Sequence, residues 1–166
     1  MLISVVVATY NRPDALAAVL RSLQKQSDRE FEVVVADDGS RNDTAQVVQR
    51  AHAAFPVPLT HVWQEDAGFR LAAVRNRATA RARGNYLVYL DGDCIVRRNF
   101  VRAHRDLAER RWCVTGGRVL LSESFTHQVL ASGTAIEDWS VFYAAVAALQ
   151  GKLNRALSLA HVPLGP

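Results

Sequence analysis

Two carboxylates separated by a single glycine, Asp91-Gly92-Asp93, directly follow an apolar run at residues 86–90. Two carboxylates this close repel each other, and a bound divalent cation relieves the repulsion. Their hard oxygen atoms suit Mg²⁺ or Mn²⁺. Gly92 allows tight backbone curvature and close approach of a ligand. A solvated turn is the alternative for such a short pattern, but its place after a strand favours Asp91 and Asp93 as metal ligands.

A second acidic pair, Asp37-Asp38, follows the apolar run at residues 31–36 and precedes Gly39-Ser40. The pattern has two interpretations. It forms a turn with a helix cap, or one carboxylate accepts the N–H of a nucleobase or a ribose hydroxyl.

Arg70 stands near the start of a helix that we predict over residues 70–83. The helix macrodipole disfavours a cation there by about 0.3–1 kcal/mol. Arg75 and Arg77 follow on the same helix. A bound anion at the helix start would reverse that cost by forming an Arg–phosphate pair. The alternative is a basic, solvated helix face. Asn76 either orients a ligand or bonds locally.

The elements that must position these side chains are strands alternating with helices. Apolar runs predict strands at 2–9, 31–36, 59–63, 86–90 and 112–121. Helical spacing predicts helices from Pro13, from Asn42 or Asp43 as the cap, over 70–83 with Gly84 as its end, and over 100–110. We therefore expect an α/β fold, a mostly parallel sheet flanked by helices, which binds ligands beyond the carboxyl ends of its strands.

The alternation stops after residue 121. Apolar residues at three- and four-residue intervals between 136 and 157 predict an amphipathic helix, or two with a break at Gly151. We expect two parts, residues 1–121 and a helical tail at 122–166.

Composition excludes several other classes of protein. The chain has 166 residues, of which 49% are hydrophobic and 22% charged, so neither disorder nor collagen-like structure is expected. The longest apolar run, 141–149, is shorter than the roughly 20 residues of a membrane span, and we expect no signal peptide. Cys94 and Cys113 are expected to be free thiols. A net charge of +4 is too small to indicate nucleic-acid binding.

Two nucleotide-binding motifs are absent. No G-x-x-x-x-G-K-[ST] occurs, and the turn after the first strand lacks G-x-G-x-x-G. P-loop nucleotidases and dinucleotide-binding folds are therefore not expected.

Four segments in this order, at 5–12, 33–40, 64–76 and 86–93, resemble the donor-binding half of glycosyltransferase family 2, which has the GT-A fold. The segment at 64–76 resembles the bacterial polysaccharide and lipopolysaccharide branch. The resemblance extends over about residues 2–121. It implies an enzyme that moves a sugar, with inversion, from a nucleotide-diphosphate donor, usually UDP-linked, to a saccharide or lipid-linked acceptor.

The resemblance also implies roles for individual residues. The residues that would bind the nucleotide include Gly92 and Asn76, and the implied cofactor is Mn²⁺ or Mg²⁺. The resemblance implies that the nucleotide lies against Thr9, Tyr10 and Arg12, and that its base is bound by Asp38, with or without Asp37. The diphosphate would be faced by Arg70 and Arg75. The ribose and the metal would lie between Asp91 and Asp93, with Asp93 the direct metal ligand.

The family's general base lies in an acceptor-binding half, which we expect beyond the end of this chain. The chain would then be the donor-binding part of a longer cytoplasmic enzyme, with peripheral contact to the inner face of the membrane and no nucleic-acid partner. Two alternatives stay open. One is a truncated or non-catalytic fragment that binds nucleotide sugars. The other is a nucleotidyltransferase, although residues 9–14 lack the glycine-rich basic loop usual in that class.

Overall fold

A computed structural model of the protein describes residues 1–154. The chain forms two compact units, Met1–Arg110 and a second unit that begins at Arg111. Each is described by itself.

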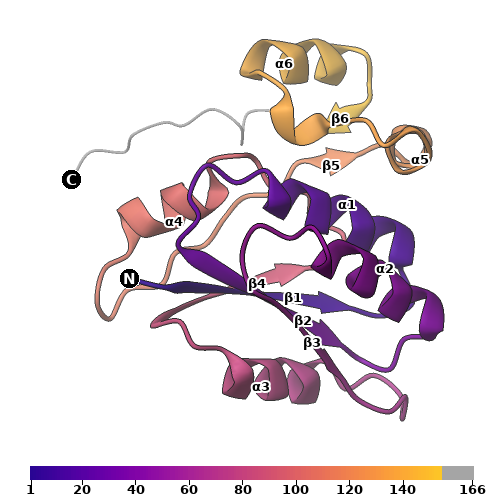
Figure 1. Cartoon of the computed structure of the whole chain (residues 1–166). Helices are drawn as coiled ribbons and strands as arrows, with labels where there is room; N and C mark the ends of the chain where they lie inside the picture. The colour runs from indigo at the N-terminus through magenta and orange to yellow at the C-terminus, as the bar shows by residue number, and fades with distance from the viewer. Residues whose placement is uncertain (155–166) are drawn as a thin grey trace. The chain divides into compact units, whose positions relative to one another are not determined.

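The first unit is built on a four-stranded parallel sheet in the order β3-β2-β1-β4 (Figure 1). The central strands β1 and β2 are buried along their whole length, as the three consecutive valines in each predict. The strands are β1 (Ile3–Thr9), β2 (Phe31–Asp37), β3 (Leu59–Trp63) and β4 (Tyr86–Asp91).

Helices cover both faces of this sheet (Figure 1). The helices are α1 (Pro13–Gln24), α2 (Asn42–His52), α3 (Leu71–Arg81) and α4 (Phe100–Leu107). Alternate residues of β1 point to opposite faces: Val5 and Val7 join the core under α1, α2 and α4, whereas Val6 packs with Val74 and Ala78 of α3. The predicted α/β fold, a parallel sheet flanked by helices, is confirmed.

The helix ends differ from the sequence-based expectations. The N-cap of α2 is Arg41, without a side-chain hydrogen bond, because Asp43 instead accepts from the neighbouring Thr44 N. Helix α3 ends at Arg81, before Gly84. A Cβ at Gly84 would lie 2.5 Å from Ser4 Oγ, so close packing against β1 explains this glycine better than a helix cap.

The second unit contains short elements. These are β5 (Leu120–Leu121), α5 (Glu123–Ser132), the 3₁₀ helix η1 (Ile136–Asp138), α6 (Val141–Leu149) and β6 (Leu153–Asn154). Side chains cap both helices: Ser122 Oγ accepts from Phe125 N, and Ser140 Oγ accepts from Tyr143 N.

One prediction for this part of the chain was wrong, and a second was wrong only in part. The strand expected at 112–121 is reduced to β5, which pairs antiparallel with β6 rather than joining the parallel sheet. Gly116-Gly117 offers no side chains to pack there and weakens a strand. The predicted break at Gly151 is confirmed, since Gly151 adopts a φ of +70° and the chain continues as β6. The helix before this break starts only at Val141, after the short 3₁₀ helix η1, and not at residue 136. The part of that prediction beyond residue 154 lies outside the described residues.

Within residues 1–154, no helix has the length and apolar character required to cross a membrane.

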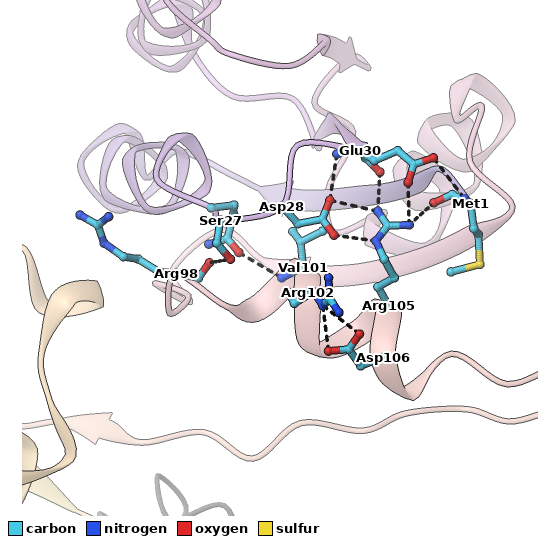
Figure 2. Close-up of polar contacts among 10 residues, drawn as sticks. Met1, Ser27, Asp28, Glu30, Arg98, Val101, Arg102, Arg105 and Asp106 are labelled. Atoms are coloured by element: carbon cyan, nitrogen blue, oxygen red, sulfur yellow. Dashed lines mark hydrogen bonds and ion pairs between the residues drawn. The ribbon is translucent and has the colours of Figure 1, made fainter.

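Gln26 and Ser27, just after α1, bind the segment that links β4 to α4 through hydrogen bonds. Gln26 is buried; its Nε2 donates to Arg97 O at 2.8 Å and its Oε1 accepts from Val101 N at 3.0 Å. Ser27 N donates to Arg98 O at 2.9 Å, and the Ser27 side chain donates to the same oxygen (Figure 2). This segment begins just after Asp93, so the hydrogen bonds of Gln26 and Ser27 restrain the loop that carries the acidic pair.

Arg105 of α4 ties the same region to the opposite, amino-terminal edge of the sheet (Figure 2). Its guanidinium binds both carboxylate oxygens of Asp28, at 2.6 and 3.1 Å. It also donates to the main-chain oxygens of Met1 and Glu30 and pairs with the Glu30 carboxylate at 3.1 Å. The hydrogen bond from Arg105 lowers the pKa of Asp28.

Candidate active site

The parallel register brings the ends of all four strands to one edge of the sheet. Thr9 of β1 pairs with Asp37 of β2, Asp37 pairs with Trp63 of β3, and Ala8 of β1 pairs with Asp91 of β4. The polar segments that follow these strands are therefore neighbours, in the order in which the strands lie.

Asp37 is fully buried and organises the turn after β2. Its Oδ1 accepts from Ser40 N at 2.8 Å, and its Oδ2 lies 3.0 Å from His61 Nε2. Because a carboxylate only accepts, the His61 nitrogen carries the proton. Burial by itself raises the pKa of Asp37, but the hydrogen bonds from His61 and Ser40 outweigh it, so the pKa is lowered. Asp37 therefore holds the turn after β2 in place, and its carboxylate is not exposed to solvent.

Asp38 joins the turn after β2 to the start of α3. Its Oδ1 accepts from Gln64 Nε2 at 2.5 Å, and its Oδ2 accepts from Arg70 N at 2.9 Å. The same Gln64 nitrogen donates to Arg70 O at 3.3 Å. Asp38 therefore closes the loop between Gln64 and Arg70 against the sheet. Gln64 was not singled out from the sequence, although it is the first polar residue after the third strand.

The loop between β3 and α3 packs closely on the turn after β2. Gly39 has a φ of +95°, and a Cβ there would lie 2.6 Å from both Cα and N of Asp66. The Tyr10 hydroxyl donates to Asp66 Oδ2 at 2.9 Å, and this bond raises the pKa of Tyr10. The Arg70 guanidinium donates to Glu65 O, which holds that side chain along the loop.

The acidic pair after β4 is held by the backbone of β1. Gly92 N donates to Ala8 O at 2.7 Å, and a Cβ at Gly92 would lie 2.6 Å from that oxygen. Close approach to a strand therefore requires glycine at this position.

The acidic pair also forms a group of possible metal ligands. One ligand atom each from Asp91, Asp93 and Cys94 lie within 4.8 Å of one another. Cys94 donates to Asp93 Oδ1 at 3.5 Å. Arg75 Nη2 donates to Asp91 Oδ1 at 2.7 Å and brings a cation to the same carboxylates. Two carboxylates suit a hard divalent cation, and a thiol is a softer neighbour.

The remaining predicted residues lie at the same edge with different surroundings. Thr9 is buried, and its Oγ1 has no hydrogen-bond partner among the described residues. Arg12 pairs with Asp14 at 3.1 Å; its pKa is raised chiefly by that hydrogen bond, and the charge of Asp93 adds to the effect. Asn76 is exposed on α3.

The structure thus joins the predicted residues through two networks. One contains Asp38, Gln64 and Arg70, and the other contains Arg75 and the acidic pair. The first joins the ends of β2 and β3 to the N-cap of α3, and the second joins the end of β4 to the second turn of α3.

Comparison with known proteins gives a family match over most of the chain. The model of glycosyl transferase family 2 matches residues 4–157. Chondroitin synthase of Escherichia coli is 35% identical over 106 residues, which are 63% of this chain and 15% of that protein. The chain spans a quarter or less of the length of the first curated relatives that it matches.

Two solved structures resemble the chain. Residues 1–349 of S. aureus TarS in complex with UDP-GlcNAc give a TM-score of 0.59 at 30% identity, covering 64% of this chain and 30% of that one. The mannosyltransferase PcManGT from Pyrobaculum calidifontis, in complex with GDP-Man and Mn²⁺, gives 0.58 at 27% identity, covering 76% and 37%.

Proposed function

The chain belongs to glycosyl transferase family 2, and on this basis we propose that its sheet edge binds the nucleotide-diphosphate donor for a sugar transfer. The family match agrees with the resemblance found in the sequence. The donor is proposed to be a UDP-sugar and the acceptor a polysaccharide or lipopolysaccharide. Two similar proteins bind UDP-GlcNAc and GDP-Man, and a third is a chondroitin synthase.

One observation carries the proposal. Arg70 and Arg75 occupy the N-cap and the second turn of α3, and Arg75 contacts Asp91, a member of the acidic cluster. An edge with both guanidinium groups and paired carboxylates suits a diphosphate bridged to a divalent cation, since the phosphates pair with the arginines and the cation with the acids.

The donor set fits Mn²⁺ or Mg²⁺, with Asp91 and Asp93 as the residues that would hold it. When bound, such a cation acts as a Lewis acid that stabilises negative charge on phosphate oxygens.

The residues of the chain contribute to the reaction by binding charge. As the bond between the anomeric carbon and the diphosphate oxygen breaks, the leaving nucleoside diphosphate gains negative charge. Arg70 and Arg75 stabilise that charge without transferring a proton. Inversion requires the acceptor hydroxyl to attack from the opposite face of the sugar, with its proton passing to a base that we propose lies outside residues 1–154.

A thermal-shift panel of UDP, GDP, CDP and dTDP, each with and without Mn²⁺, tests the proposal on the full chain. UDP with Mn²⁺ should raise the midpoint most, since ligand at 100 times its Kd stabilises by about 2.7 kcal/mol. If no nucleotide shifts the midpoint at millimolar concentration, with or without metal, the proposal is wrong.

A further inference from the structure

An arginine is paired with one of the candidate metal ligands. Arg75 Nη2 lies 2.7 Å from Asp91 Oδ1, and the side chains of Arg75 and Asp91 are 31% and 49% exposed. Asp91 also belongs to the cluster with Asp93 and Cys94. The positive charge of the guanidinium therefore lies next to a carboxylate that would hold a divalent cation.

A cation on Asp91 and the Arg75 guanidinium repel each other. With the guanidinium in contact with a carboxylate oxygen, a metal on that carboxylate would be about 5 Å away. At that separation, repulsion of a divalent cation by one positive charge weakens metal binding about fivefold to tenfold, even in a watery environment.

Arg75 also has donors that its contact with Asp91 does not use. Its Nε is buried and has no hydrogen-bond partner among the described residues. A guanidinium has five N–H donors, and a phosphate group can accept two of them side by side. Asp91 accepts only one of these donors, so the guanidinium keeps N–H groups with which it can bind a phosphate.

We propose that Arg75 is the resident counter-ion of the Asp91–Asp93 metal site and exchanges partners on binding. Without a divalent cation it neutralises Asp91. When a cation binds the acidic pair, the guanidinium leaves Asp91 and pairs with the diphosphate of the donor. The second half of this exchange rests on the proposed function, whereas the first half concerns the metal alone.

The exchange predicts effects of opposite sign for one substitution. Arg75→Met should bind Mn²⁺ about fivefold to tenfold more tightly than the unaltered protein in the absence of nucleotide, and should bind UDP with Mn²⁺ at least tenfold more weakly. Arg77→Met is the matched control, because Arg77 lies on the exposed face of the same helix and the substitution removes the same charge. Its Mn²⁺ affinity should change less than twofold. Arg75→Lys keeps the charge and should keep Mn²⁺ affinity near that of the unaltered protein.

Electron paramagnetic resonance titration of free Mn²⁺ measures these affinities on the full chain. The double variant Arg75→Met/Asp93→Asn should lose the gain. If the gain persists in the double variant, the cation binds elsewhere and the proposal fails. An Arg75→Met affinity equal to or below that of Arg77→Met also overturns it.

The outcome for the proposed function is read separately. If UDP binds to the unaltered chain while Arg75→Met shows no gain in Mn²⁺ affinity, only the counter-ion exchange is wrong. If no nucleotide binds to the unaltered chain, the proposed function is wrong, whatever the Mn²⁺ titration gives.

Discussion

Removal of Arg105 should destabilise the first unit far more than removal of Arg102 on the same helix. Arg105 and its partner Asp28 have side chains only 18% and 10% exposed. Breaking a buried ion pair costs about 3–5 kcal/mol, and the slight exposure here reduces this to about 2–4 kcal/mol for Arg105→Met. For a chain of this size that corresponds to a fall of about 5–15 °C in Tm.

The matched control is Arg102→Met. Arg102 pairs with Asp106 one turn along α4, with side chains 62% and 54% exposed (Figure 2). Exposed pairs at this spacing contribute about 0.3–0.5 kcal/mol, so its Tm should change by no more than about 2 °C. Thermal unfolding followed by circular dichroism at pH 7 measures both. Equal losses of stability in the two variants would refute the argument that the half-buried Arg105–Asp28 pair stabilises this unit more than the exposed Arg102–Asp106 pair does.

The loss of stability in Arg105→Met should also depend on pH. The hydrogen bond from Arg105 lowers the folded-state pKa of Asp28, so the stability it contributes is fully present above the unfolded pKa of about 3.9. That contribution is lost as the pH falls through the folded pKa. The difference in the free energy of unfolding between the unaltered protein and Arg105→Met, measured in urea, should therefore narrow as the pH falls below about 4. A difference that stays constant would mean that Asp28 does not carry the effect.

Three further substitutions test the site, and a fourth, at Gly68, serves as a control. Asp93→Asn should weaken Mn²⁺-dependent UDP binding by about 1.5–3 kcal/mol; unchanged affinity in calorimetry would remove Asp93 from the site. Gly39→Ala should destabilise by at least about 2 kcal/mol and weaken UDP binding, because its Cβ would lie 2.6 Å from the backbone of the next loop. Gly68→Ala is the control for Gly39→Ala: Gly68 has a φ of +82°, but a Cβ there would meet no atom within 4 Å, so the substitution should cost only about 1 kcal/mol. Urea unfolding measures the stability of both glycine variants. His61→Phe removes a hydrogen bond that lowers the pKa of Asp37. Because the stability that Asp37 contributes is lost as the pH falls, the variant should unfold in acid at a higher pH than the unaltered protein. An unchanged midpoint of acid unfolding would contradict this.

The sequence by itself determined the sheet, the family and the edge of the sheet at which the candidate site residues gather. Unbroken β-branched runs such as Val5-Val6-Val7 predict strands buried on both faces, and the alternation of strands with helices predicts parallel order. Once the strands are parallel, polar segments after their ends must lie along one edge. The positions of Asp38 and Asp91 at that edge followed from this geometry alone.

Only the tertiary structure decided which groups contact each other at that edge. That Asp38 accepts from Gln64 and Arg70, and that Arg75 pairs with Asp91, depends on side chains far apart in the sequence, whose meeting depends on how each loop packs. No periodicity encodes such contacts. The same reason explains the wrong predictions after residue 110: short elements there depend on caps, glycine conformations and local pairing rather than on a long hydrophobic pattern.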